Sequence, residues 1–212
     1  MSFKRATWTA LFSCFILGAL FPLGFAPFGW WPVTWASTAL YMSLLSVAPT
    51  TRSALARGWW FGFGLYGVGA SWVYISMHDF GYTPAWLAGP LTTLFVAGIA
   101  LFFVLHAAFY RLLRLHRFPL LGFPASWVLF EWVRTWLLTG FPWLFTGYSL
   151  MDSPLAKTAQ IGGVFFSSWL ATTLAGLLLT LIVELSQLPE HARWPRLRQR
   201  VLPRAVSLAV LM

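Results

Sequence analysis

The chain has 212 residues, of which 59% are hydrophobic and only 9% are charged, with a mean hydropathy of +0.73. A soluble domain usually carries about 25% charged residues to cover its surface, so this composition excludes an ordinary water-soluble globule. The net charge of +9 does not indicate a nucleic-acid-binding surface, because the basic residues gather between apolar runs, as they do in oriented membrane proteins.

Apolar runs recur along the chain at lengths typical of membrane helices. About 20 apolar residues cross the roughly 30 Å hydrocarbon core of a bilayer. We expect six transmembrane helices, at residues 6–24, 32–47, 55–77, 84–113, 123–139 and 164–187. The first is interpreted as an uncleaved anchor, because no cleavage site follows it and further spans do. The predicted fold class is therefore an all-α polytopic membrane protein.

A shorter apolar run closes the sequence. Residues 205–212 follow a basic stretch and begin a new hydrophobic segment, which is too short to cross a bilayer. We expect this run to be the start of a seventh helix, in a chain that is truncated within it.

The basic residues lie in alternate loops, which predicts an orientation. Cytoplasmic loops of membrane proteins carry an excess of Lys and Arg. With a cytoplasmic N-terminus, 12 of the 14 basic residues fall on the cytoplasmic side. These are Lys4, Arg5, Arg52, Arg57, Arg111, Arg114, Arg117, Arg193, Arg196, Arg198, Arg200 and Arg204. The opposite, translocated side then displays loops at about residues 25–31, 78–83 and 140–162.

Two opposite charges lie inside the fifth predicted span. Glu131 and Arg134 are three residues apart, so they share one face of a helix. A charge at the bilayer centre costs roughly 2.5–3.5 kcal/mol on insertion scales, and such residues mark functional sites by default. Two interpretations stay open. The pair lines a polar pocket or holds the translocated loop in place, or the two charges neutralise each other so that the helix can pack in the bundle.

The chain after this span is rich in residues that break helices. Residues 140–149 combine Gly, Pro and aromatic side chains, and non-helical backbone at this depth must be covered by protein or face a water-filled cavity. Phe141, Trp143 and Tyr148 are therefore candidates for a rim that contacts lipid or a neighbouring domain. The alternative is an ordinary interfacial aromatic anchor at the end of a helix.

Few other residues suggest chemistry. His78 and Asp79 lie at the mouth of the same translocated face and are candidates for the same rim, although a solvated loop is the simpler interpretation. His106 is expected to find a hydrogen-bond partner within the bundle. Cys14 is the single cysteine, which excludes a disulfide framework, and its apolar surroundings disfavour a thiolate. No catalytic residue, metal or cofactor is predicted.

A G-x-G-x-x-G pattern at residues 62–67 is interpreted as a packing feature. A dinucleotide-binding fingerprint would need a strand before it, and this part of the chain predicts helix on both sides. Small residues four apart, such as Gly58 and Gly62, let membrane helices approach closely. The sequence therefore predicts tight helix contacts here.

Seven segments, in this order along the chain, resemble the apolipoprotein N-acyltransferase family. They are Phe25–Pro32, Gly69–Ser76, His78–Gly81, Glu131–Arg134, Gly140–Trp143 with Gly147–Ser149, Asp152–Leu155 and Gly162–Val164. One such motif alone would be weak, but together they cover nearly the whole chain. The resemblance implies a multi-pass protein of the bacterial inner membrane that acts in the last step of lipoprotein maturation.

The resemblance also implies a division of labour. Members of the family have a membrane bundle and a periplasmic nitrilase-like domain with a Glu-Lys-Cys triad. That Cys takes an acyl group from a phospholipid as a thioester and passes it to the diacylglyceryl-cysteine amino group of an apolipoprotein. Neither Glu131 nor Cys14 matches the triad. We therefore expect these residues to be the membrane-embedded portion, inactive alone, with phospholipid, apolipoprotein and membrane lipids as partners.

A second hypothesis comes from a different class of protein: a stand-alone small membrane transporter or scaffold that reuses this bundle. Transporters usually contain internal repeats with broken helices in matching positions. The sequences of residues 24–31 and 140–143 resemble each other weakly. Both follow helices that are expected to run outward, so they do not form an inverted repeat.

Overall fold

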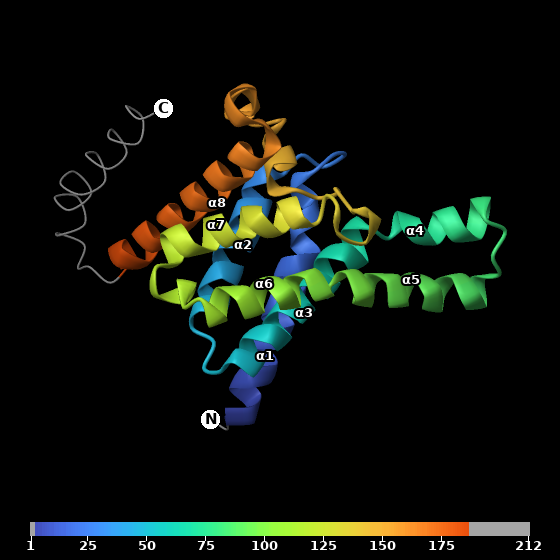
Figure 1. Cartoon of the computed structure of the whole chain (residues 1–212), viewed down its shortest axis with the longest axis horizontal. Helices are drawn as coiled ribbons and strands as arrows, with labels where there is room; N and C mark the ends of the chain where they lie inside the picture. The colour runs from blue at the N-terminus through green and yellow to red at the C-terminus, as the bar shows by residue number, and fades with distance from the viewer. Residues whose placement is uncertain (1–2, 187–212) are drawn as a thin grey trace. The chain divides into compact units, whose positions relative to one another are not determined.

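The computed structural model of the chain describes residues 3–186, and its regular elements there are all helical (Figure 1). The α-helices are α1 Phe3–Leu20, α2 Trp31–Ser46, α3 Thr51–Gly69, α4 Trp72–Ile75, α5 Ala85–Ile99, α6 Leu101–Leu112, α7 Pro119–Val133 and α8 Ala159–Ser186. Single 3-10 or π turns are η1 Phe21–Gly24, η2 Ser76–Phe80, η3 Leu115–Arg117, η4 Leu137–Thr139, η5 Thr146–Leu150 and η6 Ala156–Thr158. The predicted all-α class is confirmed over the described residues.

The chain divides into two compact units, at Gly176. The first unit contains α1 to α7 and the N-terminal part of α8. The second begins at Leu177 and contains the remainder of α8. The predicted start of a seventh helix, residues 205–212, and the basic stretch at 193–204 lie outside the described residues.

Three helical stretches are long and apolar enough to cross a membrane: Thr7–Gly24, Ala85–Leu112 and Ala156–Ser186. The structure therefore matches the expectation of six spans only in part. Helices α2 and α7 have 16 and 15 residues, which is fewer than the roughly 20 that a span needs. Helix α3 is longer, but it carries two arginines in its first two turns.

Several helices begin at residues suited to a helix start. The Thr50 hydroxyl accepts a hydrogen bond from the Ser53 amide at 3.1 Å, which caps α3. Pro32 and Pro119 lie in the first turns of α2 and α7, where the missing N–H of proline costs nothing. These residues fix where the three helices begin, and therefore where the loops before them end.

Glycines let three helices of the first unit approach closely. A Cβ added at Gly18 of α1 would lie 2.0 Å from the carbonyl oxygen of Phe61 in α3. On the other side of α3, a Cβ at Gly58 would lie 2.4 Å from the carbonyl oxygen of Phe103 in α6, and Gly62 faces the same residue at 2.8 Å. The predicted tight packing is confirmed at Gly58 and Gly62, because no larger residue fits these contacts.

An aromatic core fills the space between α2, α3, α6 and α7. The rings of Tyr41 and Phe61 stack with centroids 4.0 Å apart. Phe103 packs edge-on against Phe61 at 5.2 Å and against Trp127 of α7 at 5.6 Å. Such pairs add about 0.5–1.5 kcal/mol beyond the area they bury. This core fixes α7, and with it the residues that follow α7.

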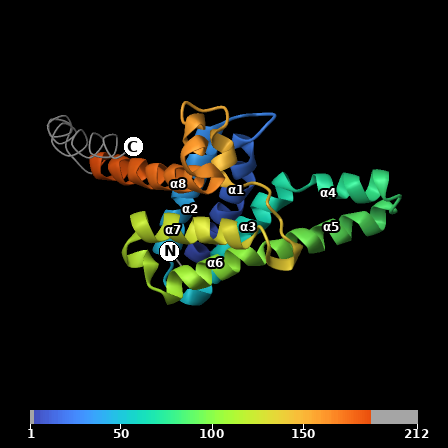
Figure 2. The ribbon, with the colours of Figure 1, turned by 45° about the horizontal axis from the view of Figure 1, so that its top comes forward.

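Helix α4, with turn η2, lies beside α5 and extends away from α1, α2 and α3 (Figures 1 and 2). Many large apolar side chains of this pair are exposed, among them Trp72, Ile75 and Phe80 of α4 and η2 and Trp86 of α5. A helical hairpin with apolar side chains on its outside suits a lipid surrounding better than water. The hairpin carries His78 and Asp79 at its turn.

Helix α7 ends six residues before the end of the fifth predicted span. Its last residue is Val133, and the backbone carbonyl of Arg134 accepts a hydrogen bond from the Phe141 amide at 2.7 Å instead of continuing the helix. Leu138 and Thr139 have φ angles of 54° and 72°, a left-handed conformation that no helix interior contains. The chain therefore turns back on itself before the Gly and Pro residues that were expected to break it.

Candidate functional site

Residues 140–150, which we call the rim segment, follow this turn. Gly140 has a φ angle of 86°, and a Cβ there would lie 2.2 Å from the carbonyl oxygen of Thr135, so only glycine fits. Leu144 also has a positive φ, of 60°. Left-handed backbone at residues other than glycine persists only where the surrounding structure holds it. The contacts described next provide that support.

The Glu131 carboxylate holds the middle of the rim segment. Its Oε1 atom accepts hydrogen bonds from the Thr146 amide at 2.7 Å, the Thr146 hydroxyl at 2.9 Å and the Trp127 indole N–H at 3.0 Å. Glu131 is only 4% exposed. Hydrogen bonds to a charged, buried acceptor contribute more than neutral ones. The carboxylate therefore acts as a tether between α7 and η5.

Arg134 holds the same segment from its other side. Its Nη1 atom donates a hydrogen bond to the Tyr66 hydroxyl in α3. Its guanidinium lies over the Phe145 ring, 4.9 Å from the centroid, and over the Tyr66 ring at 5.7 Å. Cation–π contacts contribute roughly 2 kcal/mol or more when they are desolvated, and Arg134 is 4% exposed.

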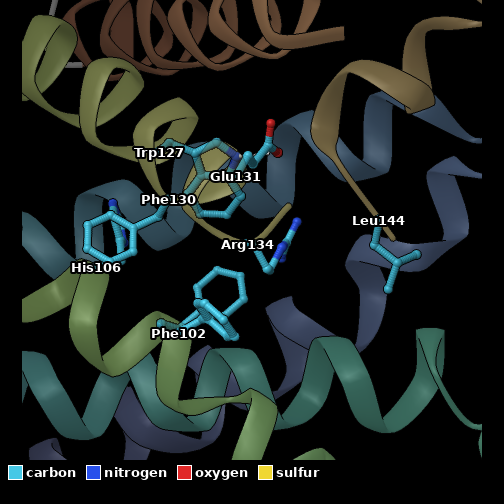
Figure 3. Close-up of a pocket in the computed structure, with 8 residues that line it drawn as sticks. Phe102, His106, Trp127, Phe130, Glu131, Arg134 and Leu144 are labelled. Carbon is cyan, nitrogen blue, oxygen red and sulfur yellow. Dashed lines mark hydrogen bonds between the residues drawn. The ribbon is translucent and has the colours of Figure 1, made fainter. Parts of the chain in front are cut away.

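Glu131 and Arg134 do not form a direct ion pair with each other. Over the described residues, the one carboxylate contact of a basic side chain within 4.0 Å is that between His78 and Asp79. Both residues line one cavity, and Figure 3 shows the Glu131 carboxylate and the Arg134 guanidinium apart from each other. Each charge is instead used separately, Glu131 on Thr146 and Arg134 on Tyr66 and Phe145.

The predicted rim residues differ in exposure. Phe141 points into the bundle, where its ring packs against Tyr66 at 5.8 Å and Phe95 at 5.6 Å. Trp143 is 54% exposed and packs edge-on against Trp72 of α4 at 5.7 Å. Tyr148 is 42% exposed and stacks on Phe145, the ring that the Arg134 guanidinium also contacts. Trp143 and Tyr148 are therefore available for contacts outside the bundle.

His78 and Asp79 lie on turn η2, and their contacts are local. The His78 Nδ1 atom pairs with the carbonyl oxygen of Thr83 at 2.8 Å, and Nε2 lies 3.9 Å from Asp79 Oδ1. The His78 ring also packs against Tyr74. The two side chains are 39% and 55% exposed, and these contacts all lie within residues 74–83.

Sequence reasoning missed the partners of the two charges. Thr146 and Phe145 lie beyond the turn that follows α7, and Tyr66 lies in α3. The Arg134–Tyr66 contact joins residues 68 positions apart. No local pattern signals such a contact. His106, in contrast, does find the predicted partner within the bundle, at Ser126 Oγ, 3.0 Å away.

Over residues 3–186, no group of three or more His, Cys, Asp and Glu side chains is placed to hold a metal ion. Cys14 is buried among apolar side chains in α1. Its surroundings contain no hydrogen-bonded base that would generate a thiolate. The arrangement of the site is therefore one that positions a loop, with no assembled nucleophile among the described residues.

An all-helical bundle with long apolar helices, buried ionisable side chains and a helix-breaking segment has the features of a membrane protein. Residues 17–177 match the family described as "Apolipoprotein N-acyltransferase N-terminal domain". The chain belongs to this family.

Three relatives show how much of such proteins the chain represents. It is 46% identical to the apolipoprotein N-acyltransferase of Pseudomonas syringae pv. tomato, over 87% of this chain and 36% of that protein. The proteins of the same name from Azotobacter vinelandii and Coxiella burnetii are 46% and 43% identical, over 84% and 79% of this chain and 35% of each protein. The chain thus spans about a third of the length of the curated relatives it matches.

Proposed function

We propose that the chain is the membrane-embedded portion of a phospholipid:apolipoprotein N-acyltransferase in the bacterial inner membrane. The observation that carries this proposal is the 46% identity, over 87% of the chain, to a relative that bears the name of this enzyme. In this role the bundle presents phospholipid and the diacylglyceryl-cysteine of an apolipoprotein to a periplasmic nitrilase-like domain. The chemistry belongs to that domain, so the 212 residues alone are inactive.

The rim segment is the part of the bundle that we assign to this task. Trp143 and Tyr148 extend out of a segment whose position is set by two buried charges, and aromatic side chains with a polar tip suit the headgroup zone. His78 and Asp79 extend the same surface on the hairpin. In this proposal Glu131 and Arg134 position the rim and take no part in the chemistry.

Growth of an acyltransferase-depleted strain tests the proposal. Residues 17–177 of this chain replace the matching region of the Pseudomonas syringae relative, and the 212-residue chain alone is expressed in parallel. We expect the chimera to restore growth and the chain alone not to. A chimera that inserts at normal levels without restoring growth would contradict the assignment, and growth with the chain alone would overturn the claim that it is inactive.

The proposed orientation has six spans and a cytoplasmic N-terminus, supported by the distribution of basic residues. Single cysteines at the exposed residues Met151 and Leu113 test it, since Cys14 is fully buried and gives little background. A thiol reagent that cannot cross the inner membrane should label Met151→Cys in intact cells and label Leu113→Cys only after lysis. Labelling in the reverse order would invert the topology.

The transporter alternative makes a different prediction. Uptake of a solute by the purified chain in liposomes, above that of empty liposomes, would favour it. The exposed aromatic rim and the family membership both favour the acyltransferase role instead.

A further inference from the structure

A small cavity lies in the first unit between α6, α7 and the rim segment (Figure 3). Aromatic rings and Leu144 form most of its wall, and Glu131, Arg134 and His106 form the polar part. Its volume is about 20 Å³ for a water-sized sphere, whereas a cavity needs roughly 10–15 Å³ to hold one water molecule. The space suits one water and is too small for an acyl chain or a phosphate group.

Two side chains that line this cavity, Glu131 and Arg134, have buried polar atoms without hydrogen-bond partners. Arg134 Nε, Arg134 Nη2 and Glu131 Oε2 are buried and have no hydrogen bond to any described residue. Leaving a buried donor or acceptor unpaired costs about 1–3 kcal/mol, and more where the group is charged. Three such atoms without any hydrogen-bond partner would therefore cost a large part of the free energy of unfolding, which is about 5–15 kcal/mol for a typical protein.

We propose that the cavity binds an ordered water molecule that accepts a hydrogen bond from the Arg134 guanidinium and donates one to the Glu131 carboxylate. A water molecule suits this place because it both donates and accepts hydrogen bonds and fits the small volume. Arg134 repels a cation from this place, and Glu131 repels an anion. The carboxylate has room for such a donor, because each of its oxygens accepts two hydrogen bonds and Oε2 has no partner among the described residues.

This water connects the two tethers of the rim segment. Glu131 binds the Thr146 amide, and Arg134 lies over Phe145, the preceding residue. A bridge between the two charges makes their contributions cooperative, since moving either side chain breaks the hydrogen bonds of the other. The proposal concerns the bundle itself and does not depend on the proposed acyltransferase role.

A structure of the 212-residue chain in lipid, at a resolution that shows other buried waters, tests the proposal. We expect density within hydrogen-bond distance of Arg134 Nε or Nη2 and of a Glu131 carboxylate oxygen. A cavity without density would overturn the proposal. A direct Glu131–Arg134 ion pair that closes the cavity would overturn it as well.

Water-edited solid-state NMR of the same chain in liposomes gives a second measurement that needs no variant. Magnetisation transfer from water to the Arg134 guanidinium should build up several-fold faster than transfer to the backbone amide of Phe61. Phe61 is fully buried and does not line the cavity, so it reports the rate expected of dry interior. Equal build-up at the two positions would contradict a bound water.

Discussion

The rim segment and turn η2 are both irregular backbone between helices, yet they are held by different means. The rim segment is fixed by Glu131 and Arg134, which lie inside the bundle and are 4% exposed. Turn η2 relies on contacts of His78 with its own neighbours, and its side chains are open to their surroundings. A substitution inside the bundle should therefore move the rim segment and leave η2 unchanged.

The largest expected effect comes from Glu131→Ala. The Thr146 amide would lose its acceptor, and Arg134 would be left as an uncompensated buried charge. We expect the free energy of unfolding to fall by about 3 kcal/mol, measured by equilibrium unfolding in lipid bicelles. Proteolytic cleavage within residues 140–150 should accelerate, while cleavage near η2 stays at the wild-type rate.

Two variants control this experiment. Glu131→Gln keeps the shape and one accepting oxygen, so it should lie between wild type and Glu131→Ala. Glu184→Ala removes an exposed glutamate from α8, and its unfolding free energy should stay within about 0.5 kcal/mol of wild type. A Glu131→Ala protein as stable as Glu184→Ala would show that the carboxylate does not hold the rim segment.

A smaller effect is expected at Tyr66→Phe, which removes the hydroxyl that accepts from Arg134. Hydrogen bonds to charged groups contribute about 1.5–3 kcal/mol, and neutral ones about 0.5–1.5 kcal/mol. Tyr110→Phe is the matched control, because Tyr110 is equally buried and its hydroxyl pairs with the neutral Ser46 hydroxyl at 2.8 Å. Tyr66→Phe should therefore lower the unfolding free energy more than Tyr110→Phe. Equal losses would argue against a charged donor at Tyr66.

The sequence predicted the helical class and the tight glycine contacts, and it indicated that Glu131 and Arg134 lie inside the bundle, because composition, residue spacing and charge within an apolar run are local properties. It did not predict that the two charges act on different partners. Tyr66 and Thr146 come to them only through the packing of α3 against α6 and α7, across 68 and 15 positions of sequence. The end of α7 was also missed, because the Phe141 amide competes for the Arg134 carbonyl from beyond the turn.

The smallest changes in stability are expected at the exposed residues of the two regions. Trp143→Ala loses one ring contact with Trp72, worth about 0.5–1.5 kcal/mol. His78→Ala should change the unfolding free energy by no more than about 0.5 kcal/mol.

The two variants are distinguished by a growth measurement, in which each substitution is made in the chimera and expressed in the acyltransferase-depleted strain. If both variants insert normally but restore growth poorly, the two regions form one contact surface although they are held differently. A loss confined to Trp143→Ala restricts that surface to the rim segment, and normal growth with both contradicts its assignment.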